Sequence, residues 1–441
     1  MLSHPLSARV LGPVLWPGEE GFADEVLAHN RAVVHTPELV VGATSTQDVV
    51  EAVRWAGMQG LPLTVLATGH GARTPVACGV IVTTRRITGV RVDPDSRTAT
   101  IGAGSAWTDV VPAADAAGLT PVAGSSTHVG VVGYLLGGGL GPLARSHGFS
   151  SDQIESLTVV TGTGEVVEAS AGEHPDLFWA LRGGRAGLGV VTQVRLRLVS
   201  VPELYAGSLF FDTDHVPTVL REWLAWTQVA DEVTTTSAAI VRFPPFDAVP
   251  APLRGRTALS LRFARPGDAR TGALVAEPLR GLAPVLLDGL GVLPVAQAER
   301  IHNDPTDPAP SWVRGLMLSR SDDQLATTVL AHGGPAVDHP FLSVELRHVA
   351  GATGRDVPGG SAVAGRGAAF TFGVLGIDPA AFETVLPAAA ESAFRALRPW
   401  ASEELNPNFS GAGPARWSVA TTDRLGETRR RYDPAGVFSL V

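Results

Sequence analysis

The chain has 441 residues, a formal net charge of −9 and a charged fraction of only 17%. This length suits two domains, and the acidic balance argues against a nucleic-acid partner, because phosphates call for a basic surface. All 34 basic residues are arginine, which excludes Schiff-base chemistry and a phosphate-binding P-loop, since both need a lysine amine.

Cysteine and histidine usage narrows the function classes further. The single cysteine, Cys78, rules out an intrachain disulfide, and the 12 histidines show no metal-ligand spacing. Residues 1–14 lack a basic stretch followed by an apolar one, and no run of about 18 apolar residues occurs. We therefore expect a cytoplasmic protein with no metal site and no membrane segment.

The first 200 residues predict alternating helices and strands. Ser45 is suited to begin a helix, because Asp48 follows at capping spacing, and Gly60 is suited to end it. Strands are predicted at 63–67, 80–84, 98–103 and 190–199, a helix at 106–117 and a hairpin at 157–167. The strand at 63–67 is expected to be buried and to end in a turn at 68–71.

The sequence changes character near Pro202. Proline-rich loops at 244–252 and 303–310 separate a helical segment at 218–227 from strands at 257–263, 341–349 and 368–374. These patterns predict an α+β fold with one domain over 1–200 and a second α+β domain over 201–395. The segment 396–441 is expected to be short and irregular.

Two glycine clusters, at 137–141 and 183–189, could let backbone N–H groups approach a phosphate-bearing cofactor. Either cluster alone is also typical of an ordinary turn, and His70 alone is typical of a loop histidine. The G-x-G-x-x-G, H-E-x-x-H and G-x-S-x-G patterns are absent. A Rossmann dinucleotide site, a metalloprotease and a nucleophile-elbow hydrolase therefore have no support.

Several short motifs, taken together and in order, are more specific than any of these residues alone. The motifs are Thr68-Gly69-His70-Gly71, Gly124-Ser125-Ser126-Thr127-His128-Val129-Gly130, Leu136–Gly141, Asp176–Gly184, Gly189-Val190-Val191-Thr192, Asn408-Phe409 and Arg431-Tyr432-Asp433-Pro434. In this order and spacing the chain resembles the FAD-linked oxidases related to berberine bridge enzyme, within the vanillyl-alcohol oxidase superfamily. The resemblance covers most of residues 36–192 and the tail.

The resemblance implies a PCMH-type FAD-binding domain, completed by the C-terminal segment, and a substrate domain over the isoalloxazine. It implies that His70 bonds covalently to the flavin. Some relatives add a cysteinyl link at the position of Ser126, and serine cannot form it, so one covalent link is expected. The resemblance assigns cofactor contacts to His70, Thr68, Gly69, Gly71, Gly124, Ser125, Ser126, Val129, Gly130, Gly133, Gly138, Gly139, Gly189, Val191, Asn408 and Phe409.

Two further residues are placed beside the flavin by the same resemblance. Val129 stands where a small side chain admits oxygen, which favours an oxidase over a dehydrogenase. Tyr134 stands near the pyrimidine edge, where its hydroxyl could stabilise negative charge on the reduced ring. An aromatic ring packed on the glycine turn is the alternative for Tyr134.

The candidate catalytic residues lie on the strand predicted at 341–349. Alternation puts Ser343, Glu345 and Arg347 on one face and His348 on the other. Glu345 is the candidate base and Arg347 could hold a carboxylate or phenolate, although a polar face of this kind is often simply solvated. The strand at 368–374, where relatives often carry the base, offers only Thr371.

These observations lead to a functional hypothesis with two alternatives. The chain is expected to be an FAD-dependent oxidase that removes a hydride from a hydroxyl- or amine-bearing small molecule, such as a sugar or natural-product intermediate. The hydride passes to flavin N5, and molecular oxygen is reduced to hydrogen peroxide. The alternatives are a dehydrogenase with another acceptor and a non-redox cyclase that retains FAD structurally.

Overall fold

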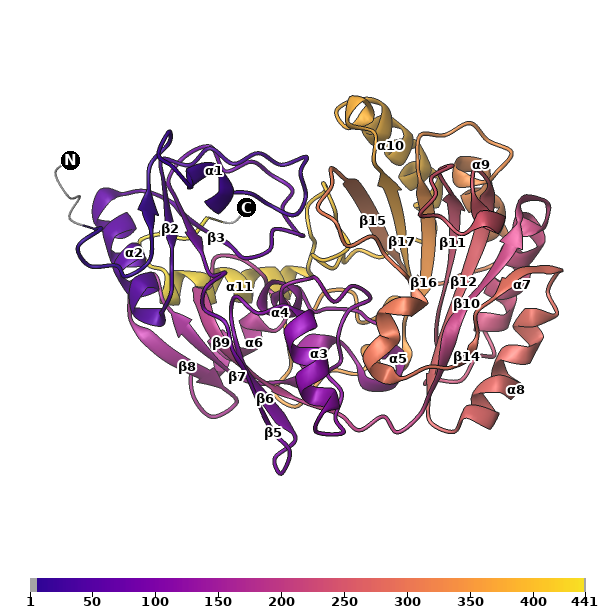
Figure 1. Ribbon diagram of the computed structural model, residues 1–441, viewed down its shortest axis with the longest axis horizontal. Helices are drawn as coiled ribbons and strands as arrows, with labels where there is room; N and C mark the ends of the chain where they lie inside the picture. The colour runs from indigo at the N-terminus through magenta and orange to yellow at the C-terminus, as the bar shows by residue number, and fades with distance from the viewer. Residues whose placement is uncertain (1–5, 440–441) are drawn as a thin grey trace.

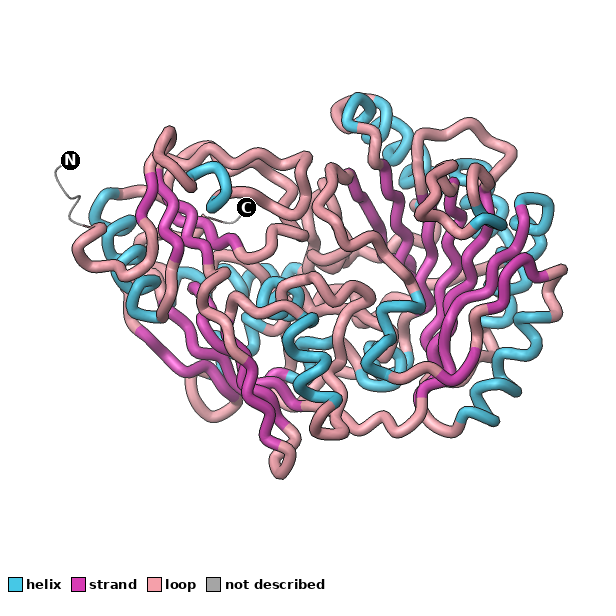
Figure 2. The backbone as a smooth tube through the Cα atoms, in the orientation of Figure 1, coloured by secondary structure: helices cyan, strands magenta, loops and turns pink. Residues whose placement is uncertain are grey.

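The computed structural model describes residues 6–439 and shows two domains side by side, joined by several crossings of the chain (Figure 1). The N-terminal domain holds two small sheets and most of the short helices. The second domain holds one large sheet, whose outer face is covered by helices (Figure 2). No helix within residues 6–439 is long and apolar enough to cross a membrane.

The first sheet of the N-terminal domain has the strand order β1-β2-β4-β3. Strands β2, β4 and β3 run parallel, and helix α2 makes the crossover after β2. The elements are β1 (Val14–Leu15), α1 (Phe22–Glu25), β2 (Leu39–Gly42), α2 (Thr46–Gln59), β3 (Leu63–Leu66) and β4 (Val80–Thr83). Helix α2 begins as predicted, because the backbone N–H of Asp48 donates to Ser45 Oγ.

The expectation of a buried strand at 63–67 holds only in part. Leu63 and Leu66 are buried in β3, but Val65 is 42% exposed. Strand β3 lies at the edge of its sheet, where fewer neighbouring side chains cover it.

The second sheet of this domain is antiparallel, with the order β5-β6-β9-β7-β8. Its strands are β5 (Val90–Asp93), β6 (Thr98–Gly102), β7 (Ile154–Val160), β8 (Val166–Ser170) and β9 (Val190–Arg197). The helices beside it are α3 (Trp107–Asp115), α4 (Val131–Leu136), α5 (Ala144–His147) and α6 (Pro175–Leu181). The predicted hairpin pairs β7 with β8, and its apolar residues join the core of the domain.

The second domain is built on an eight-stranded sheet whose main order is β13-β10-β12-β11-β16-β17-β15. Its strands are β10 (Leu204–Asp212), β11 (Thr235–Arg242), β12 (Thr257–Pro266), β13 (Val285–Asp288), β14 (Gly291–Val292), β15 (Trp312–Leu318), β16 (Ser343–His348) and β17 (Phe370–Gly376). Its helices are α7 (Val216–Thr227), α8 (Ala269–Arg280), α9 (Asp323–Gly333) and α10 (Val385–Leu397). These four helices pack on one face and bury the largest apolar core of the molecule.

The uncovered face of this sheet turns toward the N-terminal domain (Figure 1). Strand β16 contributes residues to both faces of the sheet. Val344 and Leu346 enter the helix-covered core, whereas Glu345 and Arg347 lie on the opposite face. This alternation follows the prediction. The polar face, however, meets the other domain rather than open solvent.

The C-terminal segment returns to the N-terminal domain and is not irregular as expected. It contains helix α11 (Val419–Tyr432), a 14-residue helix capped by Ser418 and packed through Leu425 and Tyr432. Beyond the helix, Phe438 pairs with Leu63 of β3. The helix was missed because its surface is mostly charged and its apolar face is narrow.

Candidate active site

His70 lies in the turn that follows β3, at the boundary with the second domain. Gly69 has a φ of +74°, and a Cβ there would lie 2.7 Å from Cα of Ala28, so the turn requires glycine. The His70 ring stacks on His29 with centroids 3.5 Å apart. Its Nδ1 lies 3.0 Å from Thr68 Oγ1, which also accepts from the backbone N–H of Gly130.

The environment of His70 keeps its ring neutral. Burial lowers the pKa of His70 to about 4, with smaller contributions in the same direction from His29 and His128. Among residues 6–439, no hydrogen bond engages the Nε2 atom of this ring. The ring thus offers one nitrogen held by Thr68 and one that is available for reaction.

Two arginines lie beside the His70 turn with no carboxylate partner among the described residues. Arg73 donates to Ser410 Oγ and to the carbonyl oxygen of Pro407, each at 2.5 Å. Arg185 donates to the same Pro407 oxygen at 2.8 Å and to that of Gly71 at 3.3 Å. Burial, and then the charge of Arg185, lower the pKa of Arg73 to about 9, which still leaves it cationic at neutral pH.

Arg185 also occupies an unusual backbone conformation. Its φ of +62° lies in the left-handed region, which non-glycine residues rarely adopt and which stores strain of about 1–3 kcal/mol. Sequence reasoning overlooked both arginines. The available signal was an arginine inside the glycine-rich run at 183–189.

Tyr134, on α4, packs within the glycine motifs. A Cβ at Gly139 would lie 2.4 Å from the Tyr134 ring, and one at Gly124 would lie 3.0 Å from it. Its hydroxyl is buried without a hydrogen-bond partner among the described residues. Burial raises the pKa of Tyr134 to about 12, against the opposing effects of the Ser150 side chain and then of the Arg347 charge. Tyr134 is therefore a packed aromatic ring and, at the same time, carries an unsatisfied polar atom.

The tail motif joins the same cluster from the far end of the chain. Asn408 Nδ2 donates to the carbonyl oxygen of Tyr134 at 2.9 Å. A Cβ at Gly137 would lie only 2.0 Å from Asn408 Oδ1, so only glycine at this position leaves room for the Asn408 side chain. The Arg347 guanidinium lies 5.8 Å from the centre of the Phe409 ring, which extends the cluster to the second domain.

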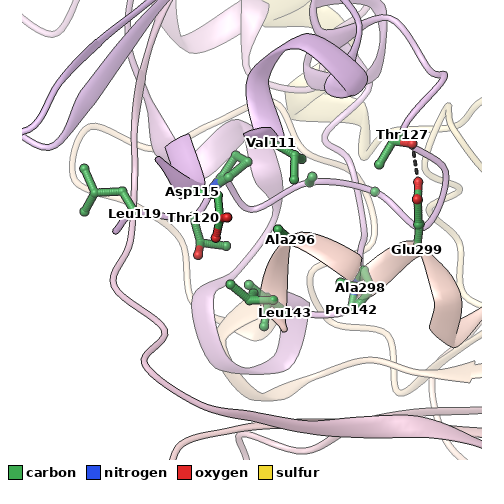
Figure 3. Close-up of a pocket in the computed structure, with 14 residues that line it drawn as sticks. Val111, Asp115, Leu119, Thr120, Thr127, Pro142, Leu143, Ala296, Ala298 and Glu299 are labelled. Atoms are coloured by element: carbon green, nitrogen blue, oxygen red, sulfur yellow. Dashed lines mark hydrogen bonds between the residues drawn. The ribbon is translucent and has the colours of Figure 1, made fainter. Parts of the chain in front are cut away.

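The loop after α3 is hydrogen-bonded to the second domain. Ser125 Oγ donates to Asp304 at 3.0 Å. Thr127 donates to Glu299, and this contact borders an open pocket lined by α3, Leu143 and residues 295–299 (Figure 3). His29 Nε2 lies 3.2 Å from the carbonyl oxygen of Thr306, so the segment from 299 to 306 crosses over the His70 turn.

A polar row crosses the open face of the large sheet. Strand register sets Arg262 of β12 opposite Ser237 of β11, Ser237 opposite Arg347 of β16, and Arg347 opposite Thr371 of β17. Residues directly opposite each other in a sheet point to the same face. The two predicted residues of β16 therefore act together with neighbours that the sequence alone did not connect to them.

Glu345 is held at the centre of this face by three donors. It accepts from Arg262 Nη1 at 2.5 Å, from Arg347 Nε at 2.8 Å and from Ser237 Oγ at 3.1 Å. Burial alone would raise the pKa of Glu345, but the charges of Arg347 and Arg262 prevail and lower it to about 2. Glu345 is therefore ionised, and a carboxylate so strongly stabilised is a weak base.

His302 is a site residue that the sequence did not reveal. Its side chain is 8% exposed, its Nε2 lies 4.0 Å from Glu345, and neither ring nitrogen has a hydrogen bond within residues 6–439. Burial lowers the pKa of His302 to about 3, helped by the charges of Arg262 and Arg347. No motif surrounds it in the sequence, so only its place in the fold identifies it.

Several of these side chains, but not Glu345, line a pocket between the two domains. The N-terminal domain contributes the segment from Leu140 to Ala144, and the sheet contributes Ser237, Arg262 and Arg347. His302 forms part of its wall. This pocket shares Pro142 with the pocket of Figure 3, which is lined by the carboxylates of Asp115 and Glu299 but by no arginine.

Most of the predicted site residues come together at this boundary between the domains. They fall into the His70 turn, the loop 124–130, the glycine run with Asn408 and Phe409, and the pocket face of β16. Val191 is an exception, because its side chain is buried in the core of the N-terminal domain. Within the described residues, no group of three or more His, Cys, Asp or Glu side chains is arranged to hold a metal ion.

Sequence comparison assigns the first domain. Residues 37–170 match the family model described as an FAD binding domain. Over 203 residues the chain is 34% identical to (R)-6-hydroxynicotine oxidase of Paenarthrobacter nicotinovorans. The match covers 46% of this chain and 44% of that enzyme, so the chain spans less than half the length of this curated relative.

Structure comparison extends the likeness to the whole chain. The fold matches berberine bridge enzyme-like protein 1 of Physcomitrella patens with a TM-score of 0.82 and 18% identity, covering 98% of this chain and 96% of that one. It matches glucooligosaccharide oxidase of Acremonium strictum with a TM-score of 0.81 and 18% identity, covering 99% and 98%. The latter carries a 6-S-cysteinyl, 8α-N1-histidyl FAD. Both domains thus have the fold of PCMH-type flavin oxidases.

Proposed function

We propose that this chain, which carries an FAD-binding domain and shares the fold of the berberine bridge enzyme-like oxidases, is an FAD-dependent oxidase with a single histidyl-linked flavin. The observation that carries the proposal is the set of unsatisfied groups at the domain boundary. Arg73 and Arg185 are cations without a counter-ion, and Tyr134 has a buried hydroxyl without a partner. A large, phosphate-bearing aromatic cofactor satisfies both needs.

The chain's residues divide the work of holding the cofactor. Arg73 and Arg185 would neutralise its phosphates, and the Tyr134 hydroxyl would meet a polar edge of its ring system. His70 would supply the covalent bond through Nε2, because Thr68 already engages Nδ1. A neutral imidazole is required for such a bond, and the lowered pKa of His70 provides it. Ser126 supplies no second link.

The pocket would hold the substrate against the flavin. FAD, when bound, accepts a hydride from the substrate and passes the electrons to molecular oxygen, which yields hydrogen peroxide. Arg347 and Ser237 would orient a polar oxygen group of the substrate, while the 140–144 segment excludes water from its other side. Glu345 would fix the orientation of both arginines rather than remove the proton itself, because it is already bound by three donors.

A spectrum of the purified protein tests the proposal directly. We expect flavin absorption in the native protein and yellow colour that stays in the pellet after acid precipitation. His70→Ala should release the colour into the supernatant, and a yellow supernatant from the unsubstituted protein would refute the covalent link. A colourless protein that does not take up added FAD would refute the flavoenzyme assignment.

The electron acceptor is tested separately on the yellow protein. With a panel of alcohols, sugars and amines, an oxidase consumes oxygen and releases peroxide for each substrate that bleaches the flavin under nitrogen. Bleaching that oxygen fails to reverse would identify a dehydrogenase. Turnover without any bleaching would identify the non-redox cyclase.

A further inference from the structure

The polar groups of the pocket between the domains are unequally satisfied. Arg347 donates to Glu345 through Nε, whereas its two terminal nitrogens have no hydrogen bond within the described residues. Arg262 donates to Glu345 through Nη1, and its buried Nε has no partner. His302 adds one more ring N–H in its neutral form, again without a partner.

The carboxylate of the cluster is, in contrast, already occupied. The two oxygens of Glu345 receive three donors, from Arg262, Arg347 and Ser237. Asp304 is exposed and accepts from Ser125. Neutral His302 offers one unpartnered acceptor nitrogen beside its N–H, whereas the two arginines offer donors only. Because buried polar groups in folded proteins almost always have partners, a group that meets the arginines must bring acceptors.

The charges of the pocket point the same way. Two guanidinium groups face a single interior carboxylate, and all three side chains are at most 23% exposed. His302 adds no charge, because the pKa of this ring is lowered to about 3 by burial and by the two arginines. The buried side chains therefore hold one positive charge in excess, while the exposed carboxylate of Asp304 also acts on Arg347. A desolvated positive charge favours an anion.

From these donors and charges we infer that the pocket recognises a substrate with an anionic oxygen group, a carboxylate or a phenolate, bound by the terminal nitrogens of Arg347 with His302 as a second donor. This inference rests on the proposed function and names its substrate class. Arg347 presents a planar fork that matches two oxygens of a carboxylate. Amines and neutral sugars lack the charge that this fork requires.

The test uses the flavin-loaded protein and three probes of equal size and different charge. Benzoate, benzamide and benzylamine are titrated while the visible spectrum of the flavin is followed. We expect benzoate to perturb the spectrum with a Kd at least tenfold lower than that of benzamide, and benzylamine to have no effect. A flavin-loaded protein that binds benzylamine or benzamide as tightly as benzoate, or that ignores benzoate, overturns the inference.

Three variants locate the binding to the named residues. Arg347→Met should weaken benzoate about tenfold to hundredfold, because a hydrogen-bonded charge is lost. Glu345→Gln should have the opposite effect and tighten benzoate, since it removes the competing carboxylate. Arg256→Gln is the control: it removes the same charge from the surface of the same domain, where Arg256 pairs with Asp212, and should leave benzoate binding unchanged.

The flavin itself offers the competing explanation for the positive charge. If Arg347→Met shifts the reduction potential of the flavin but leaves the benzoate Kd unchanged, the arginine serves the cofactor and the inference is wrong. Failure to bind flavin at all defeats the proposed function instead, and no probe titration is then performed. The two failures are therefore distinguishable.

Discussion

Replacing Glu345 with glutamine tests whether the charged cluster on the large sheet is truly desolvated. The amide keeps the size of the carboxylate but carries no charge, and its nitrogen is a donor. Glu345 accepts three hydrogen bonds, from Arg262, Arg347 and Ser237, at 2.5 to 3.1 Å. The variant therefore leaves two arginines, 12% and 23% exposed, without an interior counter-charge.

The size of the effect follows from this burial. Breaking a buried ion pair from one side lowers the free energy of unfolding by about 3–5 kcal/mol. For a domain of this size, each kcal/mol corresponds to about 2–4 °C in melting temperature, so we expect a loss of roughly 10 °C. The pKa of Glu345 is depressed, so this stabilisation is present above about pH 4.5 and is lost as the pH falls toward about 2.

Thermal melts at pH 7, followed by urea titrations, measure the loss. The double variant Glu345→Gln with Arg347→Met should recover part of it, because one of the stranded charges is also removed. Added benzoate should raise the melting temperature of Glu345→Gln more than that of the unsubstituted protein. A loss below about 1 kcal/mol would show that water screens the cluster, since exposed pairs contribute no more than that, and the argument from burial would fail.

Three other predictions address the turn, the tail and the response to acid. Gly69→Ala should destabilise the protein by at least about 2 kcal/mol, because a left-handed φ and a contact of 2.7 Å with Ala28 act together. Gly60 has a φ of +68° with nothing nearby, so Gly60→Ala measures the cost of the left-handed backbone alone, and equal losses in the two melts would contradict the proposed clash. Asp433→Asn should lower the free energy of unfolding by about 1–2 kcal/mol and speed proteolysis of the tail, because Asp433 accepts from the N–H groups of Val437 and Phe438, each at 2.8 Å. Substitution of the exposed Asp95 by Asn serves as the control. A tail cleaved no faster than in that control would refute the anchoring role of Asp433. Acidification from pH 6.5 to 5 should lower stability by about 3 kcal/mol through His302 and His348 together, because their pKa values are lowered to about 3 in the fold while the unfolded chain takes up protons below about 6.5. Chemical denaturation across this range measures the slope, and a flat profile would mean that these rings are already solvated.

The sequence by itself determined the FAD-binding motifs, the domain boundary near Pro202 and which residues of the strand at 343–348 share a face. Each of these depends on local patterns: glycines where the backbone turns or approaches another segment, and a period of two along a strand. The order of motifs placed His70, the glycine run and Asn408 in one site, and the structure brings the 134–139 segment and Asn408 into direct contact.

Only the tertiary structure decided what those residues can do. Glu345 was the candidate base by its position alone. The register of β11, β12 and β16 surrounds it with donors from distant parts of the sequence: Arg262 is 83 residues away and Ser237 is 108 residues away. Likewise, His302 and Arg73 carry no motif. His302 is important because its ring is buried without a hydrogen-bond partner, and Arg73 because it has no carboxylate partner among the described residues. The strength and pKa of a charged group depend on how far it is removed from water, and that is fixed by the packing of two domains rather than by neighbouring residues.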